Sequence, residues 1–148
     1  LGVKPAIIGQ ALSFVISQRL VRKLCEKCKQ AVKVSGNDLT KYKKFLDGLA
    51  PRVDRLVFSP PDGFKIYKSV GCNVCQGFGY LGRVGVFEFL EAGPEFESAI
   101  LKEISEVTLK KVAAEQRMVT MQEDGVLKVF SGMTTFEEVA KVTGPIEW

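Results

Sequence analysis

The residues of this chain best suited to chemistry are four cysteines arranged as two Cys-x-x-Cys pairs. The first pair is Cys25 and Cys28, and the second is Cys72 and Cys75. Two intervening residues allow both thiolates of a pair to point from one tight turn toward a single ion. Two such pairs complete the tetrahedron that Zn²⁺ adopts in structural sites. Because the chain has no histidine, we predict a zinc site made of cysteine alone.

A zinc ion held by four thiolates has no open position for water, so we expect a structural site that does not catalyse hydrolysis. Glycines at positions 71, 77 and 79 favour this interpretation, because they let backbone amides turn toward sulfur. Zinc binding should supply folding energy for residues 25–75. Removing the ion should therefore loosen that segment and leave the terminal helices largely intact.

Other uses of the four cysteines stay open from the residues alone. They are two disulfides, four unconnected buried cysteines, an iron–sulfur cluster, and a redox-active pair of Cys-x-x-Cys motifs. Disulfides need an oxidising compartment, and no signal peptide is visible in a chain that begins at Leu1. We therefore interpret the chain as a cytoplasmic fragment whose upstream sequence is missing.

Length and composition are those of an ordinary globular protein. The 148 residues suffice for one domain or two small ones. The hydrophobic fraction of 46% and the charged fraction of 26% lie near globular averages. The longest weakly charged run, from Pro5 to Gln18, is shorter than the roughly 20 apolar residues of a membrane span. We expect no transmembrane segment.

Positive charge is concentrated between Arg19 and Arg55, where eleven Lys or Arg stand against four Asp or Glu. A solvated basic surface is the simplest interpretation, although such a segment also attracts nucleic acid, acidic proteins or anionic lipid. The alternative function is therefore a free-standing, zinc-ribbon-like module that binds nucleic-acid phosphates. Its candidate contacts are Lys33, Lys41, Lys43, Lys44, Arg52 and Arg55. Few aromatic residues are interleaved with them, namely Tyr42 and Phe45, so we do not expect nucleic acid as a partner.

Short elements must position the first cysteine pair. Apolar residues at spacings of three and four predict a helix from about Pro5 to Arg19. Residues 20–24 follow as a strand or extended connection. Between the cysteine pairs, Asn37 or Asp38 can cap a second helix that continues through Leu49.

Brief strands and then helices follow. Strands are predicted through residues 64–67 and 84–90. Helices are predicted near residues 96–102, 105–113, 120–130 and 134–142. Thr120 with Glu123, and Thr134 with Glu137, have the spacing of a capping box. We expect the last three helices to form a compact, bundle-like end.

The segment from Gly71 to Glu91, GCNVCQGFGYLGRVGVFEFLE, resembles the zinc-binding segment of the type II secretion and type IV pilus-assembly ATPases. The shared pattern is Gly-Cys, two residues, Cys, a Gly-Tyr pair, Gly-Arg, Gly, and an apolar-Phe-Glu strand. ISQRLVRKLCEKC upstream and SGMTTFEEVAKVT downstream resemble the family's exit from its motor domain and its closing helices. The chain departs from many relatives in a longer basic insertion, residues 29–62, and in Glu26 and Lys27.

The resemblance implies an α+β fold in three parts. Residues 1–24 would be the terminal helix and strand of a RecA-like motor domain. Residues 25–80 would form the zinc-binding subdomain, with short strands and one helix. Residues 81–148 would be a strand followed by a small C-terminal helical subdomain.

The function implied is that of the C-terminal zinc-binding and coupling region of a cytoplasmic hexameric ATPase. Such a P-loop motor powers pilus assembly or protein secretion at the inner membrane, with a platform protein and other machine subunits as partners. This chain has no Gly-x-x-x-x-Gly-Lys-Ser or Thr motif, so ATP and Mg²⁺ would bind only in the full-length protein. The resemblance places Arg83 and Leu81 near the adenine or ribose edge of that nucleotide. Pilus assembly, secretion and DNA uptake are not distinguished by the sequence.

Overall fold

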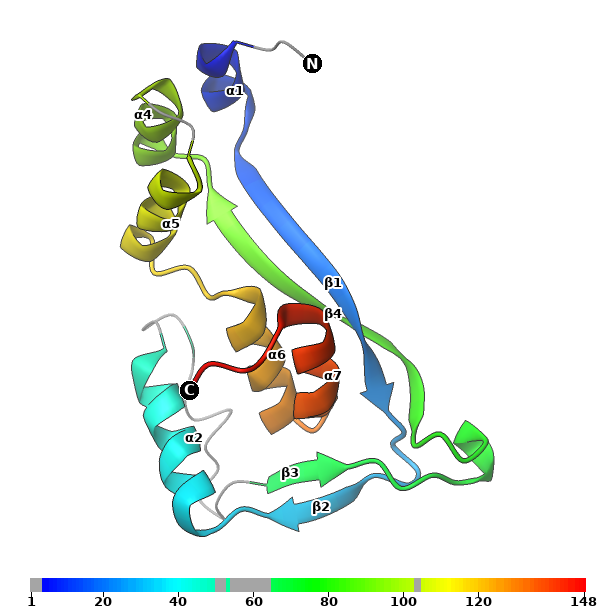
Figure 1. The fold of residues 1–148 in the computed structure, drawn as a ribbon. Helices are drawn as coiled ribbons and strands as arrows, with labels where there is room; N and C mark the ends of the chain where they lie inside the picture. The colour runs from blue at the N-terminus through cyan, green and yellow to red at the C-terminus, as the bar shows by residue number, and fades with distance from the viewer. Residues whose placement is uncertain (1–3, 50–52, 54–64, 103–104) are drawn as a thin grey trace. The chain divides into compact units, whose positions relative to one another are not determined.

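The computed structural model describes residues 4–49, 53, 65–102 and 105–148, and it is a mixed α+β structure (Figure 1). The elements are α1 (Pro5–Ala11), β1 (Phe14–Leu24), β2 (Gln30–Lys33), α2 (Gly36–Gly48), β3 (Lys65–Lys68), the 3-10 helix η1 (Asn73–Cys75), β4 (Tyr80–Glu91), α4 (Pro94–Lys102), α5 (Glu106–Glu115), α6 (Met121–Phe130) and α7 (Phe136–Thr143). Within these ranges no helix has the length and apolar character needed to cross a membrane.

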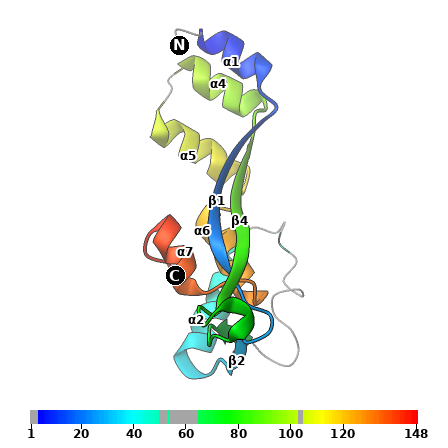
Figure 2. The same cartoon turned by 90° about the vertical axis from the view of Figure 1, so that its right-hand side faces the viewer.

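Both sheets in the described ranges are two-stranded. β1 pairs with β4, and β2 pairs with β3 in antiparallel register, with Val32 opposite Ile66. Figures 1 and 2 show β1 and β4 lying side by side. Because β1 ends at Leu24 and β4 begins at Tyr80, this pairing brings the two cysteine pairs to the same end of one sheet.

Contacts within the chain divide it into two compact units. Unit 1 comprises residues 1–17 and 88–120, and unit 2 comprises residues 18–87 and 121–148. Helices α4 and α5 thus belong to unit 1, whereas α6 and α7 belong to unit 2, so one terminal helical bundle is not confirmed. The boundaries after residues 24 and 80 inferred from the sequence stay a proposal.

Unit 1 has its core between helices. Its buried residues and their apolar neighbours are Phe96, Ala99, Ile100 and Val112, with Ile8, Leu90, Ala92 and Leu109 packed against them. Helix α1 lies against α4, and a Cβ added at Gly9 would meet the Glu97 side chain at 3.0 Å. Helix α5 starts as predicted, because the Ser105 hydroxyl accepts a hydrogen bond from the Thr108 amide.

Unit 2 buries apolar residues of β1, β4 and α6, among them Val21, Val86 and Met121. Helices α6 and α7 approach closely. A Cβ added at Gly125 would lie only 2.6 Å from Cγ1 of Val139, a residue with no exposed surface. Glycine at position 125 is therefore what permits this helix contact.

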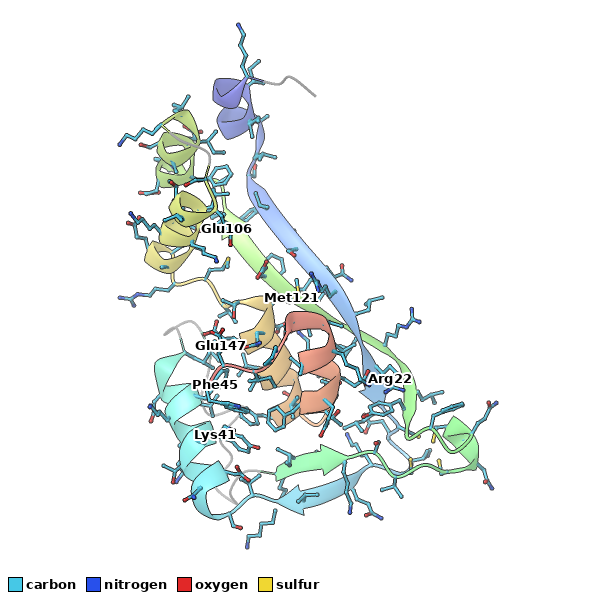
Figure 3. The ribbon with its side chains drawn as sticks, in the orientation of Figure 1. Arg22, Lys41, Phe45, Glu106, Met121 and Glu147 are labelled. Carbon is cyan, nitrogen blue, oxygen red and sulfur yellow. The ribbon has the colours of Figure 1, made fainter. Side chains whose placement is uncertain are left out.

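An aromatic cluster fixes α2 on the rest of unit 2. The Tyr42 ring centroid lies 5.3 Å from those of Phe130 and Phe136 and 5.2 Å from that of Trp148. The Lys41 ammonium lies 3.9 Å from the Trp148 ring centroid, at the place where Figure 3 labels Lys41 on α2. The helix of the basic segment thus packs against α6, α7 and the C-terminal residues, and part of its charge serves this contact.

The helix predicted from Pro5 to Arg19 is wrong in its second half. Helix α1 stops at Ala11, and β1 begins at Phe14. The run Phe14-Val15-Ile16 satisfies a helical apolar pattern, but its aromatic and β-branched side chains favour extended backbone. Pairing with β4 selects the extended strand over the helix for these residues. The strand expected at residues 20–24 is confirmed as the end of β1.

Two predicted caps are also wrong. Helix α2 has Ser35 at its N-cap, in place of Asn37 or Asp38, and α7 has Thr135 in place of Thr134. The Thr134 hydroxyl instead donates to the Arg22 carbonyl oxygen at 2.8 Å. A tertiary hydrogen bond has therefore displaced the local one that the sequence pattern favoured.

Glu138 of α7 is a buried carboxylate with two cationic partners. It accepts hydrogen bonds from Nη2 and Nε of Arg22 at 2.6 and 2.8 Å, and from Nζ of Lys141 at 2.7 Å. Its side chain is only 6% exposed. The hydrogen bond from Arg22 outweighs the opposing effect of burial and, helped by Lys141, lowers the pKa of Glu138 to about 2.

Replacing Gly125 by Ala should weaken the packing of α6 on α7. The new Cβ would clash with Val139, so we expect the free energy of unfolding to fall by about 1–3 kcal/mol. Urea denaturation followed by fluorescence of the single tryptophan measures it. Gly48→Ala is the matched control, because nothing lies within 4 Å of a Cβ there. Equal midpoints for the two variants would contradict the close helix contact.

Stability should depend on the protonation of Glu138. Since its folded pKa lies below the ordinary value, the Arg22 pair stabilises the fold above about pH 4.5 and is lost as the pH falls toward 2. We expect a loss of at most about 3 kcal/mol across this window. Glu138→Gln should flatten the acid side of a urea-denaturation pH series, whereas Glu137→Gln, at an exposed neighbour, should not. Parallel profiles for wild type and Glu138→Gln would refute the assignment.

Candidate metal centre

The structure brings together the four cysteines that the sequence singled out. All four Sγ atoms lie within 4.8 Å of one another. The separations are 3.9 Å from Cys25 to Cys72, 3.7 Å from Cys28 to Cys75, and 3.8 Å from Cys72 to Cys75. Four thiolates at the usual Zn–S distance of about 2.3 Å form a tetrahedron with edges of roughly 3.8 Å. The sulfur positions therefore fit one tetrahedral ion.

Local backbone hydrogen bonds form the two turns that carry the sulfurs. In the first turn, the amides of Cys28 and Lys29 donate to the Cys25 carbonyl at 3.2 and 2.9 Å. In the second, η1 begins directly after Cys72 and contains Cys75. The Cys25 amide donates to the Gly79 carbonyl at 3.0 Å, which joins the two turns. The ends of β1 and β4 thus position both pairs.

Two glycines permit the close backbone approach in the second turn. Gly71 has φ of +104°, and a Cβ there would lie 2.4 Å from the Gly77 carbonyl oxygen. Gly79 has φ of +74°, and a Cβ there would lie 2.6 Å from Cβ of Ser69. Neither position accepts a larger residue without backbone movement. The sequence-based interpretation of these glycines as part of a knuckle is consistent with this geometry.

Backbone amides prepare the Cys75 sulfur to carry negative charge. Its Sγ accepts from the amides of Cys72 and Gly79, each at 3.2 Å. Burial raises the pKa of the Cys75 thiol, but the two amides and the neighbouring thiols outweigh it and lower the pKa overall. Burial and the other sulfurs raise the pKa of Cys28. The same cluster thus lowers the pKa of one thiol and raises that of another, and a cation would be needed to hold all four sulfurs as thiolates.

The surroundings of the cluster suit a structural ion. Cys25 and Cys75 are 1% and 3% exposed, and all four cysteines are free thiols. The donor set is sulfur alone, which suits Zn²⁺ or an iron–sulfur cluster and does not suit Mg²⁺ or Ca²⁺. Four protein ligands fill a tetrahedral shell, so such a centre gives no position for an attacking water.

The other predicted site residues lie outside this cluster. Arg83 and Leu81 are on β4 with exposed side chains, and their role toward nucleotide stays a prediction. Of the basic residues considered for nucleic acid, Lys33, Lys43 and Lys44 are exposed. Arg52 and Arg55 lie outside the described residues.

Sequence reasoning missed the residues that surround the sulfurs. Lys29 forms an ion pair with Glu26 at 2.7 Å and donates to the Gly132 carbonyl at 3.0 Å. The Arg22 guanidinium lies 4.2 Å from the Tyr80 ring centroid and binds Glu138. The spacing of Glu26 and Lys29 could have suggested their ion pair. No local signal links Gly132 to Lys29 or Glu138 to Arg22, because the two residues of each pair lie more than a hundred positions apart in the chain.

Comparison with known proteins assigns residues 1–141 to one family. The model of the family described as "Type II/IV secretion system protein" matches residues 1–141. The chain is 38% identical over 139 residues to the type IV pilus assembly ATPase PilB of Thermus thermophilus, covering 94% of this chain and 14% of that protein.

Two further relatives are similar in extent. Identity is 33% over 143 residues to the type II secretion system protein E of Pectobacterium carotovorum, covering 97% of this chain and 25% of the relative. It is 31% over 147 residues to PilB of Pseudomonas aeruginosa, covering 97% and 23%. The chain thus spans a quarter or less of each of these three relatives. It belongs to the type II/IV secretion system protein family.

Proposed function

We propose that this chain is the C-terminal zinc-binding and coupling region of an ATPase that powers type IV pilus assembly or type II secretion. The observation that carries the proposal is the four-sulfur cluster with tetrahedral spacing. It lies in a chain whose relatives carry the names of such ATPases and secretion proteins. Both systems stay candidates, because relatives of both kinds match over nearly the same length.

Zinc is the ion that the donor set favours, and Cys25, Cys28, Cys72 and Cys75 would hold it. When bound, it supplies a cross-link and no reaction chemistry. The two sulfur pairs are separated by residues 29–71, and the pairing of β1 with β4 brings them together. An ion bound by both pairs would cross-link the ends of the two strands and add its binding free energy to the folded state. The ion is thus proposed to hold the ends of β1 and β4 as one rigid joint.

Rigidity at this joint is what makes coupling feasible. A displacement of the segment between the sulfur pairs reaches β1 and β4 together only if the joint does not open. The residues around the sulfurs support the same role, because Arg22 of β1 is bound to α7 through Glu138. Figure 3 labels Arg22 near the end of β1, beside α7. A platform protein at the inner membrane is the proposed receiver of the movement.

ATP hydrolysis is proposed for a part of the parent protein outside this chain. ATP and Mg²⁺ are assigned to the full-length, cytoplasmic homo-hexamer, since this chain has no phosphate-binding loop motif. Arg83 and Leu81 are proposed to approach the nucleotide edge there. A free-standing nucleic-acid module is less well supported, because the family match extends over residues 1–141.

Purified chain should contain one zinc ion per molecule. Elemental analysis by mass spectrometry against protein concentration measures the ratio, and Cys72→Ser should reduce it to near zero because three thiolates hold zinc far less tightly. Val74→Ala is the matched control, since Val74 lies within the same turn and is 56% exposed. Absence of any metal from freshly purified wild type would refute the centre. If the analysis finds iron with equimolar sulfide, the four cysteines hold an iron–sulfur cluster and not zinc.

In the full-length protein, Cys72→Ser should reduce pilus assembly or secretion more than it reduces the affinity for nucleotide. We expect pilus or secretion output to fall at least tenfold, because the joint opens, while the affinity for a fluorescent ATP analogue changes less than about threefold. Output is measured in cells that carry the variant at wild-type abundance, with Val74→Ala as control. Normal output from a zinc-free Cys72→Ser protein would sink the coupling role.

A further inference from the structure

The turn between α6 and α7 is bound residue by residue to the segments that carry the cysteines. We name residues 132–135 the α6–α7 corner. Each of its four residues makes a hydrogen bond to one of those segments: Lys29 Nζ donates to Gly132 O (3.0 Å), Leu24 N donates to Met133 O (2.8 Å), Thr134 Oγ1 donates to Arg22 O (2.8 Å), and Tyr80 Oη lies 3.1 Å from Thr135 Oγ1. No other turn between described helices is tied to the cysteine segments in this way.

Two of these partners are immediate neighbours of sulfur ligands, and the other two, Arg22 and Tyr80, lie within five residues of one. Leu24 precedes Cys25, and Lys29 follows Cys28. Tyr80 follows Gly79, whose amide donates to Cys75 Sγ. The corner is therefore held from the side of both sulfur pairs, and its four bonds are all satisfied only while the two pairs stay together.

The fit around the corner leaves little freedom. Gly132 has φ of +70°, and a Cβ there would lie 2.7 Å from the Tyr67 ring. Lys29 is only 19% exposed and lies 4.8 Å from the Tyr67 ring centroid. Thr134 and Thr135 are 0% and 5% exposed. Hydroxyls buried to this degree are costly to leave unpaired, so separation of the cysteine segments would destabilise the corner.

The corner leads directly into α7. Thr135 is the N-cap of that helix, and Glu138 in its first turn is held by Arg22. Phe136, the first residue of α7, packs on Tyr42, Phe130 and Trp148. A change at the corner is thus passed to the helix start and to the aromatic cluster.

We propose that occupancy of the four-cysteine site controls the order of α7 through the α6–α7 corner, with Lys29 and Thr134 as positioning residues. The inference rests on the metal centre proposed above. An ion that locks the two sulfur pairs together keeps all four corner bonds in place. By thermodynamic linkage, the bonds of the corner also strengthen metal binding. The sequence alone led to the opposite expectation, that the terminal helices keep their structure without the ion.

Hydrogen exchange of the zinc-loaded chain, before and after removal of zinc by a chelator, tests the proposal directly. We expect amides of residues 136–143 to exchange at least tenfold faster without zinc, because the corner loses its support. Amides of α4 and α5 in unit 1 serve as internal control and should change little. Fluorescence of Trp148, the single tryptophan, should shift in parallel.

Matched variants test the route of the coupling. Lys29→Met keeps side-chain length and removes the bond to Gly132; we expect zinc affinity, measured by chelator competition, to fall three- to tenfold. Thr134→Val, which touches no sulfur, should lower zinc affinity similarly if linkage is reciprocal. Both should shrink the zinc-dependent protection of α7. Lys27→Met is the control, because Lys27 lies in the same turn with its side chain exposed.

The outcomes separate this inference from the proposed function. A chain that binds no metal overturns both. Bound zinc with unchanged exchange in α7 after chelation overturns the coupling and leaves the metal centre standing. Equal acceleration in unit 1 and in α7 also overturns it, since that result means general unfolding. If Lys29→Met and Thr134→Val bind zinc as tightly as Lys27→Met, the corner is excluded as the route of the coupling.

Discussion

Convergence of four sulfur atoms from two turns is the constraint on which the rest of unit 2 depends. Thiolates within 4.8 Å of one another repel strongly unless protons or a cation neutralise them. The opposite pKa shifts of Cys75 and Cys28 express this conflict, which a divalent ion would remove. The strands β1 and β4 bring the pairs to one place, but strand pairing alone does not resolve the charge.

Contacts spread outward from the sulfurs in successive layers. Backbone amides surround Cys75, and glycines at positions 71 and 79 make the approach feasible. Outside them, Lys29 and Arg22 reach to residues after α6. Beyond these lie α7 and the aromatic cluster that carries α2. A site that looks local in the sequence is therefore the centre of a network that includes both the basic segment and the C-terminal helices.

Much of the secondary structure could be predicted, and the errors have physical causes. The helices α4 to α7 and the strand β3 lie close to their predicted ranges, because apolar periodicity and caps such as Ser105 act within a few residues. Residues 14–19 were predicted as helix because apolar spacing alone does not distinguish a short helix from a strand. Pairing with β4 made them β1. Thr134 was predicted as a cap, yet its hydroxyl bonds the Arg22 carbonyl, a contact between segments over a hundred residues apart.

The sequence by itself determined the family and the four candidate ligands, because Cys-x-x-Cys spacing and the glycines around it encode a turn within a few residues. Only the tertiary structure decided what surrounds the cysteines, namely the hydrogen bonds that residues 132–135 make to the cysteine segments and the pairing of Glu138 with Arg22. It also decided how the helices are divided between two units. These contacts join segments remote in the chain, and each uses a common residue type in an ordinary role. No local pattern identifies the partner of such a residue, because the path of the whole backbone sets which segments meet.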